Sequence, residues 1–175
     1  MSLITLQSTE TAASPVTEIY AQFRQMLGYV PSPMQLLGVS PPLLQSFAAQ
    51  AGYFFSGQQE LDGVLLAWMR YLGAQRLACK VCIDLNAGML LQMGATQEDL
   101  DAARKNPATV PLPEKEKTML LFVLDAVQND KGVTPATIAR LREQGYSERA
   151  IFEGAAYAAY SLYADTLLNI FQVEE

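Results

Sequence analysis

Histidine is absent from the sequence, and cysteine occurs only twice, at Cys79 and Cys82. A structural zinc site normally uses four ligands rich in cysteine and histidine, so a single chain cannot supply one here. The sequence also lacks a glycine-rich phosphate-binding loop. We therefore expect neither a metal ion nor an organic cofactor.

Basic residues are scarce as well, since 12 Lys and Arg stand against 18 Asp and Glu and give a formal net charge of −6. A protein that binds nucleic acid needs a clustered basic face to neutralise phosphates. This charge balance argues against a nucleic-acid partner.

No hydrophobic run is long enough for a membrane span, which needs about 20 apolar residues. The richest run, 61–72, is interrupted by Asp62 and Arg70. The first basic residue is Arg24, so the pattern of a secretory signal is not expected either. We expect a cytoplasmic protein without a membrane partner. In that compartment two closely spaced cysteines favour catalysis, redox sensing or metal binding over a permanent disulfide.

What the sequence does contain is helix punctuation, and half of its residues are hydrophobic. Apolar residues recur at spacings of three and four, as in Leu61, Val64, Leu65 and Trp68. We predict an all-α, single-domain bundle of about seven or eight helices over residues 1–175. Within it, 1–40 forms an N-terminal helical extension and 60–100 the core segment that carries the cysteines.

Capping residues and glycines predict where the helices begin and end. Thr96, followed by Asp99 three residues later, predicts the start of one helix, and Gly73 is expected to close the helix that begins near Glu60. The other expected helices cover 15–28, a short stretch within 31–42, 42–54, the cysteine segment up to Gly94, 114–129, 134–145 and 147–171.

The strongest chemical signal is the dithiol Cys79-Lys-Val-Cys82. On a helix the two cysteines share one face within reach of a disulfide, and Asn86 continues the same stripe. Lys80 and Asp84 fall on another face, toward solvent. Asn86 either orients the dithiol or a peroxide through its amide, or is a polar residue satisfied by a neighbouring backbone group.

A cysteine reacts as its thiolate, so features that lower its pKa matter. The expected helix N-terminus, the basic residues Arg76 and Lys80, and the second thiol of the pair all favour a thiolate. These features favour Cys79 as the more accessible thiolate. The alternative is that both cysteines pack simply as small apolar residues.

The stretch LDGVLLAWMRYLGAQRLACKVCIDLNAGMLLQMGATQEDL, residues 61–100, resembles the AhpD-like alkylhydroperoxidase branch of the carboxymuconolactone decarboxylase superfamily. The similarity covers most of the chain from about residue 40. It implies an AhpD-like helical fold, homo-oligomers and a redox-active CxxC disulfide. It also implies that Cys82 attacks a hydroperoxide, Cys79 resolves the sulfenic acid and an external dithiol or protein reductant resets the pair.

The sequence departs from the family at its proton relay, which consists of one glutamate and two histidines. Those positions read Ala67, Val81 and Asn86 here. General acid–base assistance is worth about 10²–10⁴ in rate, so its loss weakens the case for a vigorous peroxidase. The fold could supply a substitute, and the candidates considered are Glu60, Asp62 and Tyr71.

The favoured function is therefore a thiol oxidoreductase with alkylhydroperoxidase or peroxiredoxin-like activity, with Cys79, Cys82 and Asn86 as its site. The alternative is a weakly active or non-catalytic redox sensor, or a helical interaction protein, that has lost the relay. Decarboxylation of a lactone is less favoured, because no basic residues gather to hold a carboxylated substrate.

Overall fold

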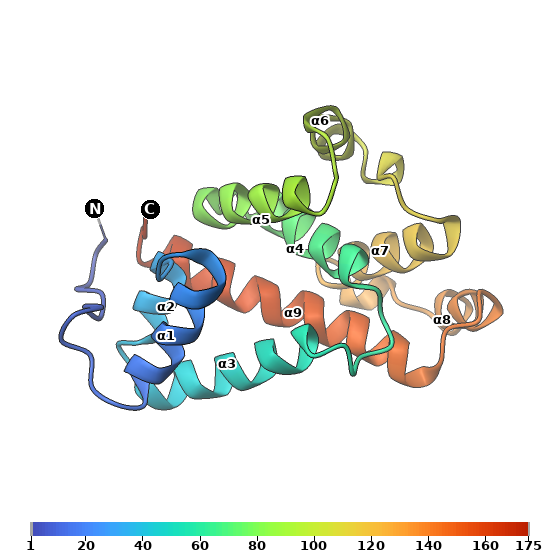
Figure 1. The fold of residues 1–175 in the computed structure, drawn as a ribbon. Helices are drawn as coiled ribbons and strands as arrows, with labels where there is room; N and C mark the ends of the chain where they lie inside the picture. The colour runs from blue at the N-terminus through green and yellow to red at the C-terminus, as the bar shows by residue number, and fades with distance from the viewer. Residues whose placement is uncertain (1, 175) are drawn as a thin grey trace. The chain divides into compact units, whose positions relative to one another are not determined.

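The structure is a computed structural model that describes residues 2–174. Over these residues it contains α-helices and two short 3₁₀ helices and no β-strand, so the predicted all-α class is confirmed (Figure 1). The α-helices are α1 Val16–Leu27, α2 Ser32–Leu37, α3 Pro41–Phe55, α4 Gly63–Leu77, α5 Lys80–Gln92, α6 Gln97–Lys105, α7 Glu114–Ala126, α8 Pro135–Glu143 and α9 Glu148–Ile170. Within this part of the chain no helix combines the length and the apolar character needed to cross a bilayer.

The chain packs as two compact units. One comprises the residues up to Gln58 together with those from Thr166 onward, and the other runs from Gln59 to Asp165. The predicted segment 1–40 lies in the first unit, and the predicted core segment 60–100 lies in the second.

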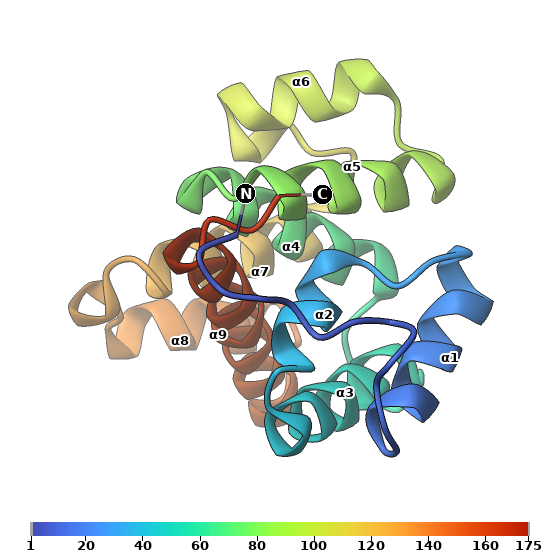
Figure 2. The same ribbon diagram turned by 90° about the vertical axis from the view of Figure 1, so that its left-hand side faces the viewer.

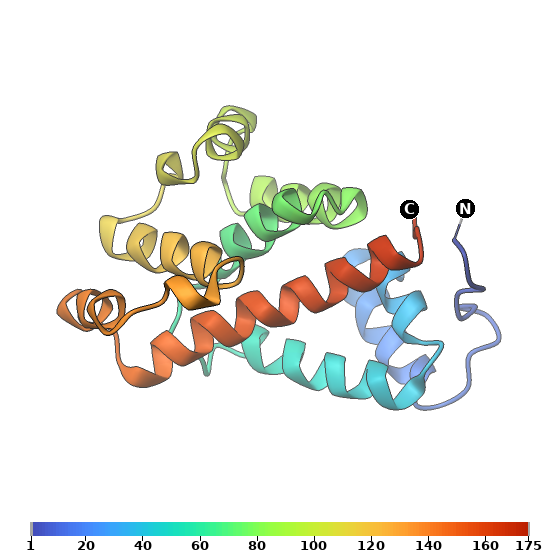
Figure 3. The same ribbon diagram turned by 180° about the vertical axis from the view of Figure 1, so that it is seen from behind.

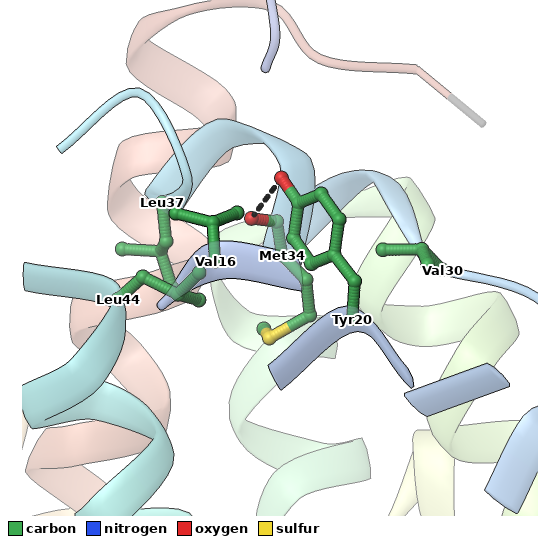
Figure 4. Packing of buried hydrophobic residues seen from close by; sticks show 6 residues of the cluster. All are labelled: Val16, Tyr20, Val30, Met34, Leu37 and Leu44. Carbon is green, nitrogen blue, oxygen red and sulfur yellow. Dashed lines mark hydrogen bonds between the residues drawn. The ribbon is translucent and has the colours of Figure 1, made fainter. Parts of the chain in front are cut away.

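The first unit is built from α1, α2, α3 and the C-terminal end of the chain. Helix α1 ends at Gly28, whose φ of 83° is a left-handed conformation that glycine adopts without strain. The hydroxyl of Tyr20, a fully buried residue, donates a hydrogen bond of 3.3 Å to the Met34 carbonyl oxygen (Figure 4). The buried cluster around this bond consists of Val16, Tyr20, Val30, Met34, Leu37 and Leu44.

The second unit holds the cysteines. Helices α4 and α5 lie side by side, and α4 also packs against α7 (Figure 2). The predicted start of α6 is confirmed, because Thr96 and Asp99 form a reciprocal capping box. At the start of α4, the Asp62 carboxylate accepts a hydrogen bond of 2.7 Å from the Val64 amide.

The prediction that Gly73 closes α4 is wrong. The helix continues to Leu77, and Gly73 is buried within it. The termination signal is instead Ala78, which adopts the left-handed conformation with φ 51° and ψ 34°. Ala78 and Cys79 donate backbone hydrogen bonds to the carbonyls of Gln75 and Ala74, the pattern of a Schellman cap. A sequence rule that waits for glycine misses this end, because alanine occupies the left-handed position.

Gly73 and Gly154 provide a matched pair for testing the packing of this unit. A Cβ added to Gly73 would meet Leu162 at 3.7 Å, an ordinary contact, whereas one on Gly154 of α9 would meet Met119 and Val123 of α7 at 3.0 and 3.3 Å. The ribbons of α7 and α9 can be followed from behind in Figure 3. Both substitutions to alanine gain about 1 kcal/mol of helix propensity. Gly73→Ala should therefore stabilise the fold.

Gly154→Ala should have a free energy of unfolding about 1–3 kcal/mol below that of Gly73→Ala, because its new methyl group is overpacked. Urea unfolding of the two variants beside the wild type measures the difference. Equal stabilities would contradict the close approach of α7 and α9.

Candidate functional site

The turn between α4 and α5 fixes the position of Cys79. Its amide donates a hydrogen bond of 3.1 Å to the Ala74 carbonyl, and its own carbonyl accepts one of 2.9 Å from the Ile83 amide. Cys79 is thus both the residue after the left-handed cap of α4 and the N-cap residue of α5. The predicted placement of the dithiol at a helix N-terminus is confirmed, and Cys82 lies in the first turn of α5.

A third group, Asp165 of α9, completes the cluster. The two cysteine sulfurs and one carboxylate oxygen of Asp165 lie within 4.8 Å of one another. All three residues are buried, with exposed fractions of 1% for Cys79, 5% for Cys82 and 4% for Asp165. Both thiols are therefore buried, and exposure does not distinguish Cys79 from Cys82. With three donor groups the cluster is one ligand short of a structural zinc site, which normally has four.

The environments of the two thiols shift their pKa values in opposite directions. Interaction with the Cys82 thiol lowers the pKa of Cys79 below its usual range, although burial and the charge of Asp165 oppose this. The same pairing with Cys79 raises the pKa of Cys82, and burial and Asp165 raise it further. Cys79 is therefore the more acidic of the two sulfurs, and Cys82 is the less acidic one.

The pKa of the Asp165 carboxyl group is shifted as well. Burial raises the pKa of Asp165 to about 6, and a hydrogen bond with Cys82 only partly offsets this rise. Its Oδ2 atom is buried and has no hydrogen-bond partner among the described residues. A buried polar atom left in this state costs free energy and calls for a functional explanation.

Of the other predicted site residues, Asn86 lies one turn after Cys82 and is buried. Its side-chain amide donates a hydrogen bond of 2.8 Å to the Cys82 carbonyl oxygen. This contact matches the reading of Asn86 as a polar residue satisfied by backbone. Lys80 lies at the surface, as predicted, and pairs with Asp84 at 2.6 Å.

The predicted aid from Arg76 is not what lowers the pKa of Cys79. The Arg76 guanidinium group donates to the Leu124 carbonyl oxygen and feels the charge of Asp125. The dominant cause at Cys79 is instead its partner thiol.

The three substitutes considered for the missing relay act elsewhere. Glu60 accepts a hydrogen bond from the Ser147 hydroxyl, Asp62 caps α4, and Tyr71 packs edge-to-face with Trp68 at 5.9 Å between ring centroids. None of them belongs to the group of ligating side chains that contains the dithiol. The carboxyl group that does belong to it is Asp165.

A weak sequence signal could have identified Asp165. Polar residues recur every four positions along α9, at Glu153, Tyr157, Ser161 and Asp165, and all four are buried. A polar stripe at helical spacing within an apolar helix indicates a face turned toward the interior. The stripe does not show which other helix it meets, so the pairing with the cysteines required the structure.

Solved structures with the same architecture clarify the fold. An uncharacterized peroxidase-related protein from Ralstonia eutropha JMP134, described as an alkylhydroperoxidase AhpD core, matches with a TM-score of 0.88 at 17% identity, covering 99% of this chain and 91% of that one. The chain has the AhpD-like fold. The AhpD-like fold predicted from residues 61–100 is thereby confirmed.

Two further matches have the same fold. An uncharacterized peroxidase-related protein from Silicibacter sp. TM1040 matches with a TM-score of 0.87 at 15% identity, over 99% of this chain and 91% of that one. The debrominase Bmp8 matches with a TM-score of 0.81 at 17% identity, over 99% and 92% of the two chains. No protein-family model matches the sequence, and no curated protein resembles it significantly. At identities of 15–17% these matches show a shared fold.

Proposed function

We propose that the protein is a thiol oxidoreductase that reduces hydroperoxides through Cys79 and Cys82. The observation that supports this most is the buried cluster of Cys79, Cys82 and Asp165, whose sulfurs and one carboxylate oxygen lie within 4.8 Å of one another. Simple packing of two apolar cysteines does not account for a neighbouring buried carboxyl group.

In the proposed reaction, the Cys79 thiolate attacks a peroxide oxygen, which breaks the O–O bond and leaves Cys79 as a sulfenic acid. The alkoxide that departs takes a proton from water and becomes an alcohol. Cys82 then forms a disulfide with Cys79, and water is released. This order reverses the one implied by the family resemblance, in which Cys82 attacks, and it rests on the acidities of the two thiols.

An external dithiol, carried by a protein reductant, would restore the reduced pair by thiol–disulfide exchange. Neither a metal ion nor an organic cofactor is required for any of these steps. We further propose that the protein works in the cytoplasm as a homo-oligomer, without a nucleic-acid or membrane partner.

A redox sensor that forms the same disulfide without rapid turnover is the second candidate. The observation that favours it is the relay position Ala67, which is fully buried and cannot exchange a proton. A two-electron dithiol could also reduce a carbon–halogen bond, as the name of the debrominase Bmp8 suggests for that protein.

Turnover separates these functions. Reduced protein is mixed with cumene hydroperoxide and excess dithiothreitol, and peroxide loss is followed over many equivalents. We expect catalytic loss that is abolished in Cys79→Ser, with Ser161→Ala as a matched control because Ser161 lies on α9 but outside the dithiol cluster. A wild-type rate equal to that of free dithiothreitol would rule out the peroxidase and leave the sensor.

A further inference from the structure

We infer that Asp165 is a catalytic residue that carries the proton from the Cys82 thiol to the oxygen that leaves Cys79 during disulfide formation. The inference rests on the proposed function and deepens it. It identifies the group that does the work of the missing relay, from a different helix than the family pattern uses.

The geometry provides the contacts that proton transfer needs. Asp165 hydrogen-bonds to the Cys82 thiol and lies within 4.8 Å of both sulfurs. The Cys82 thiol has a single proton, so it can donate to the Cys79 sulfur or to Asp165 but not fully to both. The second carboxylate oxygen, Oδ2, is buried without a partner and is free to accept or deliver a proton.

Oxidation of Cys79 changes which group accepts the proton of the Cys82 thiol, the Cys79 sulfur or the Asp165 carboxylate. In the reduced state the Cys82 thiol interacts with both the Cys79 sulfur and the Asp165 carboxylate, and the interaction with Cys79 has the larger effect on its pKa. Once Cys79 becomes a sulfenic acid, its thiolate charge is lost and the Asp165 carboxylate is the remaining anionic acceptor of the cluster. The thiol proton then moves to Asp165, and Cys82 becomes the thiolate that must attack.

The step balances with Asp165 regenerated. The Cys82 thiolate attacks the Cys79 sulfur, the S–S bond forms and the S–O bond breaks. The departing hydroxide takes the proton held by Asp165 and leaves as water. Two thiols have lost two electrons to the peroxide, and Asp165 has returned to its carboxylate form.

The proton affinity of Asp165 depends on the titratable and charged groups around it. The thiols Cys79 and Cys82 of α5 act on it electrostatically. The cation Arg70 of α4 acts on Tyr157 and Tyr160 of α9. Burial, rather than a neighbouring cation, therefore sets the proton affinity of Asp165.

The test separates disulfide closure from peroxide attack. The reduced protein is treated with one equivalent of Ellman's reagent, and release of the first and second thionitrobenzoate ions is followed from pH 5 to pH 8. The first release reports attack by the more acidic thiol, and the second reports closure by Cys82. The same variants are then oxidised with one equivalent of cumene hydroperoxide, with dimedone trapping of the sulfenic acid.

In Asp165→Asn we expect the second release to slow by about a hundredfold, the lower end of the usual range for a lost general base. Its dependence on a group that ionises near pH 6 should disappear. The first release should be unchanged or faster, because loss of the Asp165 charge lowers the pKa of both thiols. Asp165→Glu should restore part of the closure rate, and Ser161→Ala should leave both releases unchanged.

Closure in Asp165→Asn at the wild-type rate would overturn the inference. Equal slowing of both releases, or slowing in Ser161→Ala as well, would also overturn it by showing a packing defect. Failure of cumene hydroperoxide to oxidise the wild type would instead reject the proposed function, while the Ellman's measurement would still decide the role of Asp165.

Discussion

Cys79→Ser is expected to move the first thiol ionisation of the protein to higher pH, whereas Cys82→Ser is expected to leave it nearer its wild-type position. The thiolate belongs to Cys79 because the Cys82 thiol donates to its sulfur, and a serine hydroxyl at position 82 can still donate. An ordinary cysteine is only a few per cent ionised at pH 7. Cys82→Ser should therefore contain more thiolate near neutral pH than Cys79→Ser does.

Thiolate absorbance at 240 nm, titrated from pH 5 to pH 11, measures this content without requiring a reagent to reach the buried sulfurs. Cys82→Ala is the informative third variant, because it removes the donor and should move the Cys79 titration to higher pH. A wild-type thiolate that survives in Cys79→Ser and vanishes in Cys82→Ser would show that the acidities are reversed. It would then favour the attack order implied by the family resemblance.

Asp165→Asn is expected to make the protein more stable at pH 7, even though it slows the reaction. Burial raises the pKa of Asp165 from 3.8 to about 6, so the folded state holds this proton more tightly than the unfolded chain does. Its stabilising effect is fully present below pH 3.8 and is lost as the pH rises through about 6. At 1.36 kcal/mol per pKa unit, the loss in the wild type is about 3 kcal/mol.

Urea unfolding between pH 4 and pH 8 measures this loss. The variant should show a flatter profile over pH 4–6 than the wild type, because asparagine does not titrate there. The profile of Ser161→Ala should keep the wild-type slope. Parallel profiles for the wild type and Asp165→Asn would show that the carboxyl group has an ordinary pKa in the folded protein.

Features that depend on residues close together in the sequence were predictable. The CxxC pair and the Thr96 capping box depend on spacings of three residues, and both lie on helices where expected. The end of α4 was mispredicted because Ala78 adopts a conformation usually reserved for glycine.

Asp165 was missed for a different reason. Its partners are more than 80 positions away in the sequence, and no local pattern encodes which helix faces the dithiol. The three acidic or phenolic substitutes that were considered all lie close to the cysteines in sequence, and the structure assigns each of them another contact. The proton affinity of a carboxyl group also depends on its burial, which a sequence does not state.

The main-chain hydrogen bonds on both sides of Cys79 have a consequence for how such a site can change during evolution. The reactive sulfur is anchored by the end of one helix and the start of the next, through the carbonyl of Ala74 and the amide of Ile83. This anchoring does not depend on which side chains surround the sulfur. The group that handles the proton can therefore be exchanged, even for one on another helix, while the position of the sulfur is conserved by the backbone alone.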